Sequence, residues 1–220
     1  MTLLEKAEKE STESRGLLAV IVAALCVMGI AAYYFYGSRQ LNLMDVAVLL
    51  VITGFVAYGT TQNILRGVLT GISIYLATAI TGTFYRVLTP YARSFLNLLG
   101  GRGLNSPPPG GTDTSALALS FVFAALLLWI VLELLFRAAL PDTHLAFLGP
   151  VDQVGGALVY LVVGIAVAAL VFNLVGYGTA AQTAYETAAL RPELNNAMDL
   201  IYQSQSFWFA GDPPAIYTYE

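Results

Sequence analysis

Residues 153–185 read QVGGALVYLVVGIAVAALVFNLVGYGTAAQTAY, a run without one charged side chain. A helix needs about 20 mostly apolar residues to cross the hydrocarbon core of a bilayer, and this run is longer than that. Backbone amides in lipid must find their hydrogen-bond partners inside the protein, so such a run has to be helical. The stretch predicts a membrane-spanning helix over about residues 154–177.

The rest of the sequence follows the same pattern. Hydrophobic residues make up 57% of the 220 residues and charged residues only 11%, with a mean hydropathy of +0.70. A soluble domain is about a quarter charged, so most of this surface does not face water. Further charge-free runs cover residues 16–38, 46–65, 67–85 and 114–132. We therefore expect an all-α fold, a polytopic membrane helix bundle of about five transmembrane helices plus interfacial amphipathic helices.

We divide the chain into four segments. Residues 1–15 mix charges of both signs and form a polar tail. Residues 16–42 form an N-terminal transmembrane helix, 43–182 a four-helix membrane core, and 183–220 an amphipathic C-terminal helix and tail. The first span ends in an aromatic group (YYFY) typical of a membrane interface, which favours a retained helix over a cleaved signal peptide.

The connection between the second and third spans is short and polar. Only residues 60–63 (TTQN) and Arg66 interrupt the apolar pattern there, so these two spans are expected to form a tight antiparallel hairpin. Pro90 should end or kink the third helix. We expect a short amphipathic helix over about 87–99 to lie in the interface, and another over about 190–201 to lie on the membrane or on the other helices.

A few polar positions near the ends of the spans are candidate structural or functional residues. Glu133 precedes Arg137 by four residues, which favours an end-of-helix ion pair, with an ion path as the alternative. Arg66 at the short hinge either binds a lipid phosphate or, with Asp45, pins the hairpin. Asp45, Arg66 and Asp152 either form a polar gate at the helix ends or serve for helix capping and interfacial anchoring. The complete set is Asp45, Arg66, Gly67, Glu133, Arg137 and Asp152.

Small residues recur at helical spacing in the third and fifth spans. In lipid, small side chains allow helix backbones to approach closely, and helix association depends on that packing. The packing candidates are Gly71, Gly82, Gly156 and Gly164. We expect the bilayer to be one partner, and these faces to contact protein partners or a second copy of the chain.

The composition argues against several other classes of protein. A net charge of −4 without a basic patch argues against nucleic-acid binding. His144 and Cys26 are single residues of their kind, so neither a metal site nor a disulfide is expected. No nucleophile–base pairing and no phosphate-binding loop stands out. We therefore expect no enzyme activity and no cofactor.

Two groups of residues carry a family resemblance. Asp45 stands at the head of a span, and the Arg66-Gly67 pair lies just before the next span. Asp152, the Gly156-Ala157 pair and Gly164 then enter the last span. In both groups the chain resembles the colicin V production protein family, CvpA.

The resemblance covers about residues 43–200 and implies that the helix at 16–42 is an addition to a CvpA-like core. The chain departs from the family at Val68, where a bulky aromatic residue is common, and at Gln153, where arginine is usual. The resemblance implies a non-enzymatic, multi-pass protein of the bacterial inner (plasma) membrane. Its role would be in production or export of a colicin V-type toxin, or in envelope maintenance. The alternative is a structural or assembly subunit of a larger membrane complex.

Overall fold

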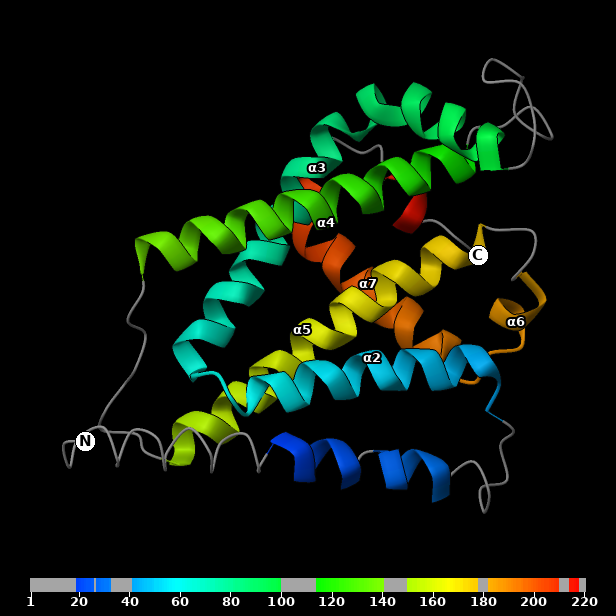
Figure 1. Cartoon of the computed structure of the whole chain (residues 1–220). Coiled ribbons are helices and arrows are strands. Elements are labelled where there is room, and N and C mark those ends of the chain that lie inside the picture. The colour runs from blue at the N-terminus through cyan, green and yellow to red at the C-terminus, as the bar shows by residue number, and fades with distance from the viewer. Residues whose placement is uncertain are drawn as a thin grey trace.

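The computed structural model describes residues 19–25, 27–32, 41–99, 114–140, 150–177, 182–209 and 214–217. These residues form helices and turns only, so the all-α expectation is confirmed for the described part of the chain (Figure 1). The polar tail expected at 1–15 lies outside the described residues. The elements are a helix at Ala19–Ala32, α2 (Leu43–Gly59), α3 (Ile64–Leu99), α4 (Thr114–Ala139), α5 (Pro150–Gly176), α6 (Gln182–Glu186), α7 (Arg191–Gln205), η2 (Ser206–Trp208) and η3 (Ala215–Tyr217).

Three of the described helices are long and apolar enough to cross a membrane. They are Ile64–Leu98, Thr114–Ala139 and Val151–Gly176. The apolar helices at Ala19–Ala32 and Leu43–Gly59 are shorter. The 17 residues of α2 extend about 25 Å, against about 30 Å for a hydrocarbon core. The protein is therefore a multi-pass helical membrane protein, and three of the expected spans reach full length.

The expected hairpin of α2 and α3 is wrong, because α2 packs along α5 and α3 packs along α4. Figure 1 shows α2 beside α5, with α3 leaving the end of α2 toward α4. The short turn at residues 60–63 joins only the ends of α2 and α3, and the two helices scarcely touch beyond it. The pairing of α2 with α5 brings backbone close to backbone, because a Cβ on Gly59 would lie 2.9 Å from the Ala157 Cα of α5.

Helix α3 continues through Pro90 instead of ending there. Proline cannot donate to the carbonyl four residues earlier and its ring crowds that carbonyl, so it bends the helix. Figure 1 shows that α3 changes direction and that its last part lies along α4. The short helix expected at about 87–99 is therefore the second arm of α3, on which Tyr91 and Phe95 are exposed, and its place in the interface stays a prediction.

Helix α7 packs its apolar face on the bundle. Leu194 and Met198 are buried, so α7 lies on the other helices, one of the two expected places. The chain then brings Phe209 against α3 at Gly82, where no Cβ could fit beside the ring. Ile216 of η3 is also buried in the core. Phe209 and Ile216, both beyond α7, are therefore part of the hydrophobic core.

The candidate packing glycines are used mainly inside the chain, not on a free surface. A Cβ on Gly164 would lie 2.8 Å from the Phe55 Cβ of α2, and Gly82 faces Phe209. Gly156 faces the carbonyl oxygens of Gln62 and Gly59. The small-residue faces of α3 and α5 therefore contact neighbouring helices of the same chain. A contact of these faces with a protein partner stays a prediction.

We expect Gly156→Ala to destabilise the protein by about 1–3 kcal/mol, the usual cost of overpacking a tight contact. Its Cβ would lie 2.5 Å from the Gln62 carbonyl oxygen, so backbone would have to move. The control is Gly71→Ala, whose Cβ would lie 3.7 Å from Val163 Cγ2, an ordinary contact. Thermal unfolding of both variants in mild detergent measures the difference. Equal melting temperatures would contradict the close α2–α5 contact.

Candidate functional site

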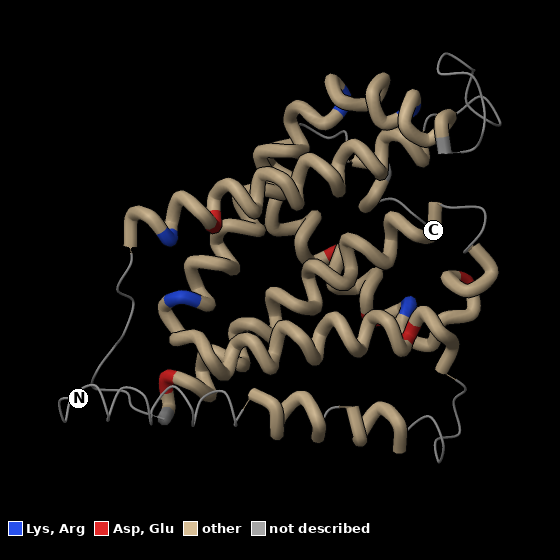
Figure 2. Tube along the Cα trace, viewed as in Figure 1, with Lys and Arg blue, Asp and Glu red and all other residues tan. Residues whose placement is uncertain are grey.

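A charged cluster lies at the end of the bundle where α2 ends, α3 begins and α4 approaches its last turns. The Glu133 carboxylate is its centre. Arg66 Nη2 donates to Oε1 over 2.8 Å, and Arg137 Nε donates to the same oxygen over 3.2 Å. Thr70 Oγ1 donates to Oε2 over 3.1 Å. Figure 2 shows an acidic position on α4 near basic positions on α4 and α3 at this end of the bundle.

Burial differs sharply among the three charged groups. The side chains of Arg66 and Glu133 are 7% and 14% exposed, whereas that of Arg137 is 48% exposed. Removing charges from water is costly, and only close, well-bonded pairing offsets the cost. The main partner of Glu133 is therefore Arg66 on α3. The pair with Arg137, expected from the sequence, is the more solvent-accessible of the two contacts.

Two tyrosines connect this cluster to α2 and α5. Arg137 Nη2 donates to the Tyr58 hydroxyl over 2.8 Å, and the Thr70 and Tyr160 hydroxyls are 3.0 Å apart. The two tyrosine rings meet edge to face with centroids 5.3 Å apart. Four helices thus contribute to one network. Sequence reasoning missed Tyr58, Thr70 and Tyr160, since aromatic and hydroxyl residues within apolar spans carry no signal of their own.

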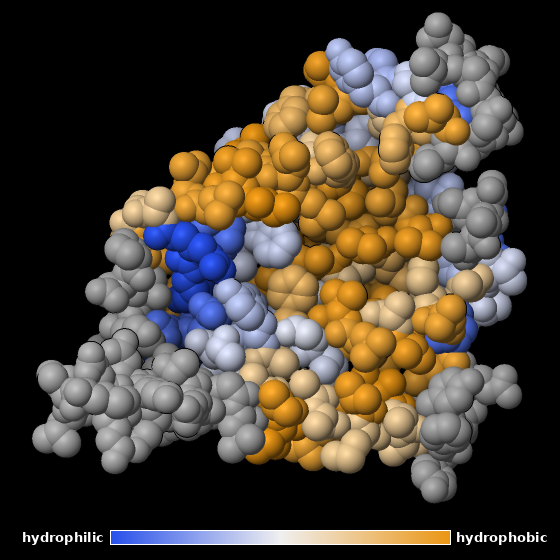
Figure 3. All heavy atoms as spheres, in the orientation of Figure 1, coloured by the Kyte–Doolittle hydropathy of each residue, from blue (hydrophilic) through white to orange (hydrophobic). Residues whose placement is uncertain are grey.

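A cavity of about 250 Å³ lies against the network. In Figure 3 a hydrophilic patch interrupts the apolar surface at this end of the molecule. The indole Nε1 of Trp129, beside the cavity, is buried without a hydrogen-bond partner. The cavity is lined by Phe55, Tyr58, Thr70, Trp129, Ile130, Glu133, Leu134, Arg137 and Tyr160.

Asp45 lies in the first turn of α2 and is fully buried. Its carboxylate accepts hydrogen bonds from the backbone amides of Asn42, Ala189 and Leu190, over 2.9, 3.0 and 2.9 Å. In turn, the Asp45 amide donates the capping hydrogen bond to Asn42 Oδ1 over 3.0 Å. Asp45 therefore joins the start of α2 to the segment before α7. Because Arg66 follows the other end of α2, the structure does not bring these two residues together.

Asp152 lies in the first turn of α5 and is buried. Its Oδ1 accepts a hydrogen bond from the Ile64 amide at the start of α3 over 2.9 Å. One of the unpaired amides of that helix end is satisfied in this way. Gly67 faces Val159 of α5, whose Cβ would lie 3.0 Å from an added Cβ. These two candidates hold the start of α3 against α5.

A further polar contact lies where α7 meets the middle of α3. Gln205 is fully buried, and its Nε2 donates to Thr78 Oγ1 over 2.8 Å and to the Tyr75 carbonyl over 3.0 Å. The Tyr75 hydroxyl donates to the Ser204 carbonyl over 2.8 Å. Sequence reasoning missed Gln205 because α7 carries many polar residues and nothing in the sequence separates the buried one from the exposed ones.

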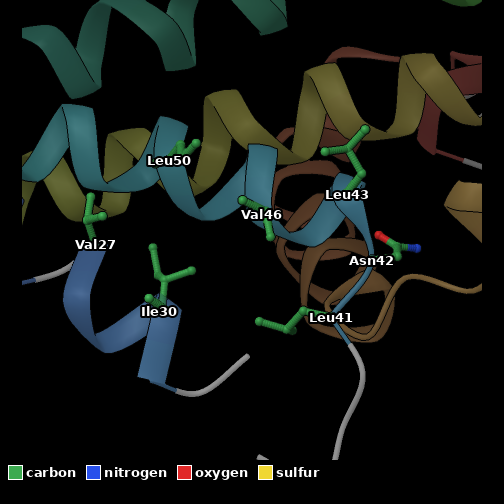
Figure 4. A pocket seen from close by; sticks show the side chains of 8 residues that line it. Val27, Ile30, Leu41, Asn42, Leu43, Val46 and Leu50 are labelled. Carbon is green, nitrogen blue, oxygen red and sulfur yellow. The ribbon is translucent and has the colours of Figure 1, made fainter. Parts of the chain in front are cut away.

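An apolar cavity of about 480 Å³ separates the helix Ala19–Ala32 from the start of α2 (Figure 4). Val27 and Ile30 face it from the first helix, and Val46 and Leu50 from α2. At the edge of the cavity, the side-chain Nδ2 of Asn42 donates a hydrogen bond to the Ala184 carbonyl oxygen over 2.5 Å. The described lining offers no ionisable group. Across the described residues, no three His, Cys, Asp or Glu side chains converge as they would around a metal ion.

Membrane-length apolar helices with a charged network at one end define a polytopic helical membrane protein. Comparison with known protein families identifies the family of membrane proteins to which the chain belongs. Residues 44–199, well over half of the chain, match the family described as Colicin V production protein, and the chain belongs to that family. The matched region runs from the first turn of α2 into α7, in agreement with the sequence-based resemblance. No curated protein and no solved structure matches the chain.

We expect Glu133→Gln to destabilise the protein by about 3 kcal/mol, since it leaves the Arg66 guanidinium buried without its charge partner. Glu193→Gln, at an exposed position of α7, is the matched control. The double variant Arg66→Gln, Glu133→Gln should recover most of the loss. Unfolding in mild detergent measures the stability of the single variant, the double variant and the control. A Glu133→Gln variant as stable as the control would contradict the role of the ion pair.

We expect Asp45→Asn to cost about 2 kcal/mol, because an amide NH₂ would then face backbone N–H donors. Detachment of the segment before α7 should accompany the loss. The readout is limited proteolysis, with faster cleavage near residues 182–190 in the variant. Asp199→Asn, at an exposed position of α7, is the control. Unchanged proteolysis in Asp45→Asn would contradict the proposed link between the start of α2 and the segment before α7.

Proposed function

We propose that the protein is a non-enzymatic component of the bacterial inner membrane that supports production or export of a colicin V-type toxin, or maintains the envelope. Family membership supports the process and the location. One structural observation supports an active role within the membrane, namely the charged network of Arg66, Glu133 and Arg137.

The depth of Glu133 makes this network unusual for a simple interfacial anchor. Helix α4 has 26 residues, and Glu133 lies six residues before its last residue, Ala139. At 1.5 Å per residue the carboxylate is attached about 9 Å from the helix end, below the outermost turns. Ionisable side chains inside membrane segments are costly and often mark functional sites. A buried ion pair is also weak evidence for stability alone, which favours a functional reason for this one.

The second candidate function is an assembly subunit of a larger membrane complex. The apolar cavity between Ala19–Ala32 and α2 favours it, because apolar side chains of a partner would fill that space. The helix also lies outside the matched family region, as an added assembly element would. The small-residue faces of α3 and α5 add no support for this candidate, because other parts of the same chain already cover them.

A complementation experiment tests the first candidate. A strain lacking the gene would receive the wild type, the double variant Arg66→Gln, Glu133→Gln, or the control Glu193→Gln. Secreted toxin and sensitivity to detergent are measured at matched protein levels in the membrane. We expect the double variant to accumulate normally yet fail to complement. Full complementation by the double variant would show that the charged network is structural and would remove its support for an active role.

Native gel separation after mild detergent extraction tests the second candidate. A large assembly that depends on the helix at Ala19–Ala32 would favour the subunit. A small species of one kind of chain would favour the free-standing component.

A further inference from the structure

We propose that the cavity beside Arg137 binds the headgroup of an anionic phospholipid. Four observations support this assignment: hydrogen-bond donors left without acceptors, a net positive charge, a wall continuous with the lipid-facing surface, and a position near the end of a span. The proposal is independent of the toxin or envelope role.

The network has more donors than acceptors. Arginine carries five N–H donors, and Arg137 uses its Nε on Glu133 and its Nη2 on Tyr58. The Tyr58 hydroxyl accepts that bond, so its own proton is left for another acceptor. A ligand for this cavity must therefore be rich in acceptor oxygens, as a phosphate is.

The charge of the site favours an anion. Arg66 and Arg137 carry two positive charges and Glu133 one negative charge, so the net charge is +1. The Glu133 carboxylate already accepts bonds from Arg66, Arg137 and Thr70. It is thus neutralised rather than repulsive to an incoming phosphate. Arg66 is buried in this pairing, so the half-exposed Arg137 is the cation that a ligand would reach.

The apolar wall of the cavity identifies the ligand as a lipid rather than a free anion. Ile130 and Leu134 of α4 line the cavity and are 56% and 60% exposed, so they also face outward. Leu127, one turn earlier, is likewise exposed. An acyl chain can follow this face of α4 while its headgroup lies against Arg137, and a soluble phosphate would gain nothing from it.

The position along α4 matches the level of a headgroup. Arg137 lies two residues before the end of α4, about 3 Å along the axis, and α4 is longer than a hydrocarbon core. Tryptophan and tyrosine are enriched at this level of the membrane, where one side of the ring is apolar and the other is polar. Tyr58, the last residue but one of α2, lines the cavity at this level.

Tryptophan fluorescence provides the test, since the chain has two tryptophans and Trp208→Phe leaves Trp129 as the single reporter. The full chain is reconstituted in vesicles that contain brominated phosphatidylglycerol or brominated phosphatidylcholine, and bromine quenches tryptophan at contact distance. We expect a preference for phosphatidylglycerol of about fivefold, the usual effect of one basic residue near an anionic surface. Arg137→Gln should reduce the preference to about one, whereas Tyr58→Phe should reduce it in part.

Arg93→Gln is the matched control, because it removes the same charge from the second arm of α3 and should leave the preference unchanged. Equal quenching by the two lipids in the parent protein would overturn the proposal, as would an unchanged preference in Arg137→Gln. Added inorganic phosphate should not compete. If millimolar phosphate abolished the preference, the cavity would be a site for a free anion and the assignment to a lipid would be wrong.

Discussion

The close contact between α2 and α5 is the constraint on which the rest of the arrangement depends. Gly59 and Gly156 allow these two backbones to meet without intervening side chains. With α2 held by α5, the turn at residues 60–63 directs α3 toward α4. Arg66 then faces Glu133 across the α3–α4 contact, and Tyr58 and Tyr160 approach from the other pair of helices. The charged network is thus a consequence of which helices pair.

Charge-free runs alone could predict the class of protein and the places of its long helices. Apolar runs that are long enough to cross a bilayer are stable in lipid only as helices, so α4 and α5 can be predicted directly from the sequence. The family could be predicted as well, from Asp45 and the Arg66-Gly67 pair, and the comparison with known families bears this out. The C-terminal amphipathic helix follows from the spacing of Leu194 and Met198.

Helix pairing could not be predicted, because a helix that is apolar on all sides shows no preferred face. The short turn between α2 and α3 suggested a hairpin, yet loop length constrains only the ends of two helices. The partner of Glu133 stands 67 positions earlier at Arg66, beyond any local spacing rule. Pro90 bends α3 without ending it, since the arm beyond still packs along α4. The direction in which each glycine points likewise depends on the tertiary arrangement.

The pairing of α2 with α5 also has a consequence for biogenesis. Roughly 100 residues separate the two helices, so at 5–20 residues per second a ribosome needs about 5–20 s between them. During that interval α2 must remain in the membrane without its partner. Because most of the α2 surface is apolar and uncharged, the helix is stable in lipid during that interval. The Asp45 carboxylate, however, lacks two of its hydrogen-bond donors until residues 189 and 190 are made, so the start of α2 is completed late although it is made early.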